Sequence, residues 1–132
     1  MSKYLDRAKE LRNDPEAHYN CNQATFLPFA ADGGMTEEMA MKLGTYFGSG
    51  MRMGSVCGAI TGGLMALGLN GADDKETLNK FYKRLRDNHG GSLNCADLLR
   101  KMKEEGIAQK DHCDGMVYEC VQLVEELLAE KA

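Results

Sequence analysis

The stretch Val56-Cys57-Gly58-Ala59-Ile60-Thr61-Gly62-Gly63-Leu64-Met65-Ala66-Leu67 is among the most hydrophobic of the chain. It lies in segment 44–71, which holds nine glycines in 28 residues, a composition also found in flexible linkers. The apolar residues favour a buried helix over about residues 56–67. Gly54, Gly58 and Gly62 recur every four residues, so one helix face would lack side chains and let another backbone approach closely.

Every other long segment also has helical rather than strand periodicity, and β-branched residues are too scarce for an alternating strand pattern. We therefore expect a single all-α domain over residues 1–132, a bundle of six or seven helices around the glycine-rich one. The boundaries follow from caps and breakers. The first helix is expected to stop before Pro15, the second to run from about Asn20 to Pro28, and the third to extend from Thr36 through Phe47. Two further helices are expected after the caps Asp73-Asp74 and Asn94, and the last is expected from about Asp111 to Glu130.

Composition limits the function classes. At 132 residues the chain can bury a core without disulfide staples, so its five cysteines favour chemical roles. Sixteen basic and twenty acidic residues give a net charge of −4, which predicts no nucleic-acid partner and no attraction to anionic lipid. The N-terminal residues lack a secretory pattern, and the weakly polar run 56–69 is shorter than the roughly 20 residues that span a bilayer. We expect a cytoplasmic protein with reduced thiols and no membrane association.

Four of the five cysteines fall where helices are expected to begin: Cys21, Cys57, Cys95 and Cys113. A thiol in the first turn of a helix faces unpaired N–H groups and the positive end of the helix dipole, which lower its pKa. The thiolate is the form that attacks disulfides and binds metals. We therefore predict these four cysteines as the reactive residues, while any one of them can also serve as a small buried apolar residue.

Cys120 lies seven residues after Cys113, two turns along the same helix and about 10 Å away. That separation exceeds what a disulfide can bridge while the helix is intact. Cys120 is predicted either to fill the core or to face the same cavity as Cys113. The other four cysteines allow three pairings, which the sequence does not rank.

Other chemical motifs are weak. No Cys-x-x-Cys pattern occurs, which removes the thioredoxin-like motif and the usual zinc-knuckle spacing. His18, His89 and His112 are candidates for proton transfer or metal binding, and also typical of loops and helix caps. His112 is the best of the three, because an imidazolium beside Cys113 would help to stabilise its thiolate.

These residues resemble the C_GCAxxG_C_C family, whose members are described as redox-active. The resemblance runs through Asn20-Cys21-Asn22-Gln23-Ala24, Gly48-Ser49-Gly50, Cys57-Gly58-Ala59-Ile60-Thr61-Gly62, Leu67-Gly68-Leu69, Asn94-Cys95 and Cys113. In this chain the cysteine precedes the glycine, one position earlier than the family name spells. The resemblance implies redox roles for Cys21, Cys57, Cys95 and Cys113, and implies nothing for Cys120.

Two functions fit this pattern. The first is a thiol–disulfide redox protein, with a thiol–disulfide oxidoreductase as the candidate enzyme class, that needs no cofactor. Cys57 would attack and Cys21 would resolve, with a redox protein or a small thiol or disulfide as partner. The second is a metal or iron–sulfur protein with the same cysteines as ligands to zinc or a cluster, although such sites usually take two ligands from one short loop. A third alternative is a purely structural helical protein, in which serine at Cys57 or Cys21 would change only stability.

Overall fold

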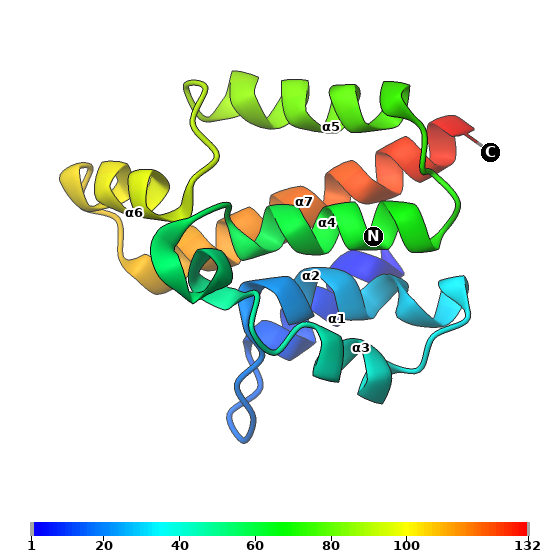
Figure 1. Cartoon of the computed structure of the whole chain (residues 1–132). Helices are drawn as coiled ribbons and strands as arrows, with labels where there is room; N and C mark the ends of the chain where they lie inside the picture. Colours follow the sequence, from blue (N-terminus) through cyan, green and yellow to red (C-terminus); the bar gives the residue numbers. More distant parts are fainter. Residues whose placement is uncertain (1, 132) are drawn as a thin grey trace.

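The computed structural model describes residues 2–131, and this part of the chain is all-helical, as expected. The α-helices are α1 (Lys3–Arg12), α2 (Cys21–Ala30), α3 (Glu37–Leu43), α4 (Gly58–Leu69), α5 (Lys75–Asn88), α6 (Cys95–Glu104) and α7 (Gln109–Lys131), with short helical turns η1 (Ala31–Gly33) and η2 (Gly50–Gly54) (Figure 1). The extended backbone includes an isolated antiparallel bridge between Val56 and Asn94.

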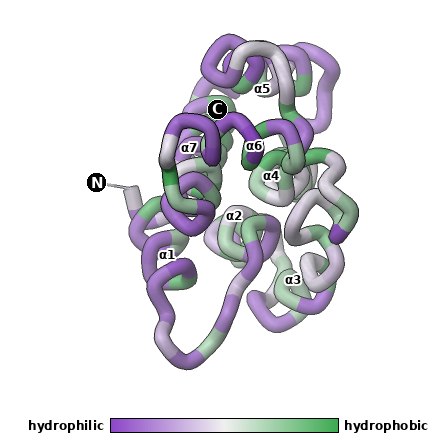
Figure 2. The backbone as a smooth tube through the Cα atoms, turned by 90° about the vertical axis from the view of Figure 1, so that its left-hand side faces the viewer, coloured by the Kyte–Doolittle hydropathy of each residue, from purple (hydrophilic) through white to green (hydrophobic). Residues whose placement is uncertain are grey.

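Three helices, α2, α4 and α7, contact one another and form the centre of the structure. Viewed from the side in Figure 2, α2 lies between α1, α3, α4 and α7, and the purple hydrophilic segments are mostly peripheral. α5 and α6 pack on α7, and α6 also contacts η2. Within residues 2–131 no helix is both long and apolar enough to cross a membrane.

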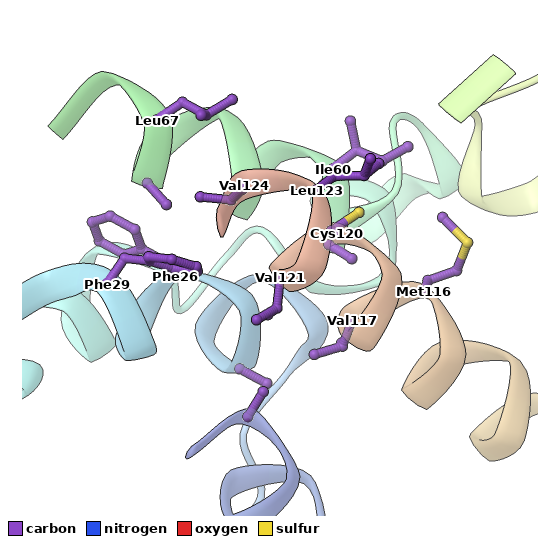
Figure 3. Packing of buried hydrophobic residues seen from close by; sticks show 14 of the residues in the cluster. Phe26, Phe29, Ile60, Leu67, Met116, Val117, Cys120, Val121, Leu123 and Val124 are labelled. Carbon is purple, nitrogen blue, oxygen red and sulfur yellow. The ribbon is translucent and has the colours of Figure 1, made fainter. Parts of the chain in front are cut away.

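The core is made of apolar side chains from these three helices. Figure 3 shows α7 residues such as Val121 and Val124 beside the aromatic rings of α2 and the aliphatic side chains of α4. Phe26, Phe29 and Ile60 are fully or almost fully buried. Burial of each such side chain contributes about 1.5–3 kcal/mol, so the three-helix contact is the main source of stability.

The glycine-rich helix α4 lies against the backbone of α2, as its small face predicts. A Cβ atom at Gly58 would lie 2.7 Å from the Phe47 carbonyl oxygen, and one at Gly62 would lie 2.7 Å from that of Asn22. Real Cβ atoms do not come so close to a backbone oxygen, so both positions require glycine. Gly54 does not belong to this face, because it precedes α4 and ends η2 with a φ of 70°.

Other boundaries differ from those expected. α2 continues through Pro28 to Ala30, because eight buried residues hold its path despite the hydrogen bond that proline removes. α3 ends at Leu43, and Gly44 caps it, instead of continuing through Phe47. α7 begins at Gln109 rather than near Asp111, which makes Cys113 its fifth residue.

The close approach of α4 to α2 gives a stability prediction. Gly62→Ala should lower the free energy of unfolding by about 1–3 kcal/mol, because the added methyl group meets the Asn22 carbonyl oxygen. Gly68→Ala, in the same helix but with no atom within 4 Å of the new methyl group, is the matched control. It should leave stability unchanged or raise it by up to about 1 kcal/mol. Urea unfolding midpoints measure both, and equal losses in the two variants would contradict the packing argument.

Candidate cysteine centre

The first element of the centre is the start of α2. Asn20 caps this helix by accepting a hydrogen bond from the Gln23 N–H, while the Gln23 side chain accepts one from the Asn20 N–H. Asn20 Nδ2 also donates to the carbonyl oxygen of Gly44 at 3.0 Å. These contacts fix Cys21, the first residue of α2, at the end of a rigid helix.

The second element is the short bridge that holds Cys57 and Cys95. Cys57 is the N-cap of α4 and Cys95 the first residue of α6. The Cys57 N–H donates to the Leu93 carbonyl oxygen at 3.1 Å, and the Cys95 N–H donates to that of Ser55 at 2.6 Å. Alternate residues of paired extended segments face the same side, so both cysteines lie on one face of the bridge.

Cys113 of α7 completes the cluster. All four predicted cysteines line one interior cavity of about 30 Å³, together with Ser49, Gly58, Leu99, Gln109, His112 and Met116. Such a cavity has room for about one water molecule. The four cysteines are separated by 36, 38 and 18 residues in the sequence. They nevertheless meet where α2, α4 and α6 begin and beside α7.

An outer cleft of about 750 Å³ opens on the other side of Cys21 and Cys113. Its walls come mainly from the segment between α1 and α2 and from the start of α7. Cys21, Ser49, Gln109 and Cys113 line both the cleft and the interior cavity, whereas Cys57 and Cys95 line the cavity alone. The four thiols therefore form an outer pair and an inner pair.

Each of the two outer thiols shifts the pKa of the other. A side-chain hydrogen bond with Cys21 is the main cause that lowers the pKa of Cys113 to about 7; burial opposes it, and Arg12 adds to it. The same interaction, and then burial, raise the pKa of Cys21. Cys113 is therefore the thiol that ionises first, and Cys21 retains the proton that the pair shares.

Arg12 also lines the outer cleft, although its sequence context did not mark it as a site residue. Its side chain is 8% exposed and donates from Nε to Asp114 at 2.6 Å and from Nη1 to the Tyr19 carbonyl oxygen at 2.9 Å. Its positive charge favours the thiolate of Cys113 and that of Cys21. The sequence did indicate that Arg12 faces the interior, because it lies four residues after Ala8 and so continues the apolar face of α1.

Burial disfavours the thiolate form of the two inner cysteines. Desolvation raises the pKa of Cys57 to about 11, although the Ala59 and Ile60 N–H groups at the start of α4 lower it. Burial, and then the charge of Cys113, also raise the pKa of Cys95. The expectation that a helix N-terminus lowers the pKa of every one of these thiols is therefore wrong. Cys57 is an N-cap and Cys113 lies in the second turn of α7, so only Cys21 and Cys95 occupy a first turn.

Cys120 and two of the three histidines do not line the cavity. Cys120 is 0% exposed and packs in the hydrophobic core, and the cavity lining does not include it. His18 lines the outer cleft, and His89 caps α5 and pairs with Glu119 at 2.8 Å. His112 is buried and lines the cavity; desolvation, and then His89, lower its pKa. These effects disfavour the imidazolium form of His112 that the sequence suggested as a partner for the Cys113 thiolate.

The segment before α4 carries backbone strain next to Cys95. Ser49, Met51 and Arg52 have φ values of 53°, 58° and 62°, in the left-handed region where each costs about 1–2 kcal/mol. Gly50 has a φ of 63°, and a Cβ there would lie 2.9 Å from the Cys95 Cβ. The strained segment therefore packs directly on Cys95.

Two observations bear on redox and metal chemistry. All five cysteines are free thiols, so no disulfide joins them. Within residues 2–131 no group of three or more His, Cys, Asp or Glu side chains has the arrangement of a metal site. The four thiols border one cavity without being placed as ligands around one point.

The fold and the centre define an all-helical protein with a cluster of free thiols beneath a surface cleft. Residues 19–127 match the family described as "Putative redox-active protein (C_GCAxxG_C_C)". The chain belongs to this family, as its motifs suggested. The comparison with curated proteins and the one with solved structures each found no match.

The lowered pKa of Cys113 predicts a distinctive pH profile. Its alkylation rate should rise through a midpoint near pH 7, because the thiolate forms below the pKa of about 8.5 of a free cysteine. Cys21→Ala and Arg12→Gln should each move the midpoint upward, because each removes a contribution that stabilises the thiolate. Iodoacetamide labelling followed by peptide mass spectrometry measures the profile.

Arg100→Gln is the matched control, because Arg100 is an exposed arginine that pairs only locally with Asp97. It should leave the midpoint unchanged. A wild-type midpoint of 8.5 or above would contradict the assignment of Cys113 as the activated thiol.

Proposed function

We propose that this protein is a thiol–disulfide redox protein in which Cys113 attacks a disulfide in the outer cleft and Cys21 resolves the product. One observation carries the proposal: two interacting thiols line the floor of the cleft, and the pKa of one of them is lowered to about 7. A thiol with a pKa near ambient pH combines a large thiolate fraction with good nucleophilicity.

The reaction proceeds in two exchanges. The Cys113 thiolate attacks one sulfur of a substrate disulfide, forms a mixed disulfide and releases the other half as a thiolate. Cys21 then loses its proton and attacks the Cys113 sulfur, forming the Cys21–Cys113 disulfide and releasing the second half of the substrate. Two electrons pass from the protein dithiol to the substrate, and a cellular thiol or dithiol returns the protein to the reduced form.

This assignment changes the roles expected from the sequence, where Cys57 attacks and Cys21 resolves. Cys57 is 5% exposed, does not line the cleft, and has a pKa raised to about 11. It therefore lacks both the access and the thiolate that a first attack requires. Cys21 keeps its resolving role, and Cys113 takes the attacking one.

The partner belongs to one of two chemical classes, a small thiol or disulfide or the exposed disulfide of a redox protein. The cleft of about 750 Å³ has the size of a small-molecule site, and its openness toward solvent also admits a protein loop. Five free thiols fit a reducing compartment such as the cytoplasm, which we include in the proposal.

The alternative function, metal or iron–sulfur binding, has one observation in its favour: four cysteines border a single cavity. The arrangement of the thiols weighs against it, since no three of them are placed as ligands. Zinc would need tetrahedral sulfurs at about 2.3 Å from the metal.

A stoichiometric disulfide reaction tests the thiol proposal. The reduced protein is mixed with 5,5′-dithiobis(2-nitrobenzoate), and the release of coloured thiolate is followed. The wild-type protein should release two thiolates in a fast phase, one for each exchange. Cys21→Ser should release one and keep the aromatic adduct on Cys113, because the resolving thiol is absent, and Cys113→Ser should lose the fast phase.

Cys120→Ser is the matched control, because Cys120 is a cysteine of the same helix that lies in the core. Its fast phase should equal that of the wild type. If Cys113→Ser retains the fast phase, or if the adduct in Cys21→Ser is found on another cysteine, Cys113 is not the attacking thiol.

Metal analysis of anaerobically purified protein decides between the two functions. The thiol proposal predicts less than stoichiometric zinc and iron, no charge-transfer absorption, and five thiols that can be alkylated after denaturation. One equivalent of zinc, or an iron–sulfur spectrum that Cys57→Ser and Cys95→Ser abolish, would establish the alternative.

A further inference from the structure

The bridge between Ser55–Cys57 and Leu93–Cys95 builds a second dithiol behind the first. Cys57 is opposite Leu93 in this pairing, so Cys95 is its diagonal neighbour on the same face. The opposite face carries Val56 and Asn94, which line a separate surface depression beside α5. Cys57 and Cys95 themselves line the cavity that they share with the outer pair.

The outer and inner pairs border one cavity, and Cys21 lies close to the start of α4 that holds Cys57. A Cβ atom built on Gly58, the residue after Cys57, would lie 3.4 Å from the Cys21 Cβ. The charge of Cys57 also acts on Cys21, and that of Cys113 on Cys95. Apart from the cysteines, His112 is the only titratable side chain among the residues that line the cavity.

From this arrangement we propose that Cys57 and Cys95 form a buried reservoir dithiol, which reduces the Cys21–Cys113 disulfide from inside the protein. The inference rests on the proposed function, because the outer disulfide is its substrate. It gives a role to the two inner cysteines, which do not line the cleft.

The transfer takes two exchanges that need no outside reactant. Cys57, as the thiolate, attacks the Cys21 sulfur; the Cys57–Cys21 bond forms, the Cys21–Cys113 bond breaks, and Cys113 leaves as a thiolate that takes up the proton of Cys57. Cys95 then attacks the Cys57 sulfur, and Cys21 leaves and takes up the proton of Cys95. Two electrons and two protons move from the inner pair to the outer pair. The Cys57–Cys21 pair expected from the sequence is the intermediate.

The direction of transfer follows from the environments of the two pairs. A dithiol whose thiolate is stabilised resists oxidation, so its disulfide is the stronger oxidant. Cys113 is stabilised as a thiolate by Cys21 and Arg12, whereas burial disfavours the thiolates of Cys57 and Cys95. The disulfide is therefore more stable on the inner pair.

Closing the inner disulfide requires a backbone shift, because diagonal neighbours lie farther apart than the roughly 4 Å between the Cβ atoms of a disulfide. The left-handed segment at Ser49, Met51 and Arg52 packs on Cys95 through Gly50. A strained segment at this place can relax when the cysteine moves.

Mapping the disulfide over time tests the proposal on the full-length protein. The reduced protein receives one equivalent of 5,5′-dithiobis(2-nitrobenzoate) without oxygen, and samples are quenched in acid, alkylated and mapped by peptide mass spectrometry. At pH 8, one unit above the Cys113 pKa of about 7, Cys21–Cys113 should appear first and then give way to Cys57–Cys95, in an excess of about tenfold, which equals about 30 mV for a two-electron couple. A second equivalent should leave only Cys120 as a thiol.

Variants isolate each exchange. Cys95→Ser should stop at the Cys21–Cys57 disulfide with Cys113 free, and Cys57→Ser, or Cys57→Ala if serine impairs folding, should stop at Cys21–Cys113. Cys120→Ser should behave as the wild type, and circular dichroism checks the fold of each variant. If wild-type Cys21–Cys113 persists at equilibrium, the reservoir is refuted and the proposed function stands. If Cys21–Cys113 never forms, both proposals are refuted.

Discussion

The close contact between the backbones of α4 and α2 is the constraint on which the rest of the structure depends. It exists because Gly58 and Gly62 lack side chains where the Phe47 and Asn22 carbonyl oxygens approach. The contact brings the starts of two helices together and places Cys57 beside Cys21. α7 packs against both helices and supplies Cys113 to the same point. The packing of small residues thus determines the position of the thiols.

The electrostatics of the centre result from competition between burial and local charge. Helix N-termini favour thiolates, and the N–H groups at the start of α4 do lower the pKa of Cys57. Burial outweighs them, because removing a thiolate from water costs more than one or two peptide dipoles return. The pKa of Cys113 is lowered instead, and a neighbouring thiol and a guanidinium lower it rather than a helix end. The same cluster therefore holds one thiol with a lowered pKa and three with raised pKa values.

Much of the fold was predictable from the sequence, because caps and periodicity act locally. Asn20 and Asp74 cap α2 and α5 where expected, and the small face of α4 meets another backbone. The expected end of α2 at Pro28 was wrong, because the burial of this helix outweighs the local effect of the proline. The sequence singled out the four cysteines that line the cavity, but it did not predict which of them has the lowered pKa. That order depends on which thiols face the cleft and on Arg12, and these are contacts between residues distant in sequence.

The position of the cysteines at helix ends also explains how sulfur exchange can be compatible with a rigid core. Cys21, Cys57 and Cys95 lie where helices begin, so a small shift of any one of them moves a cap or a loop and leaves the interior packing intact. Cys113 is held differently, within a long helix whose later turns are anchored in the core by Cys120 and its neighbours. In the proposed reaction the attacking thiol is therefore held within α7, and the resolving thiol, Cys21, lies at the start of α2. An arrangement of four cysteines within helix interiors would give the same cluster but would couple every exchange to the unpacking of the core.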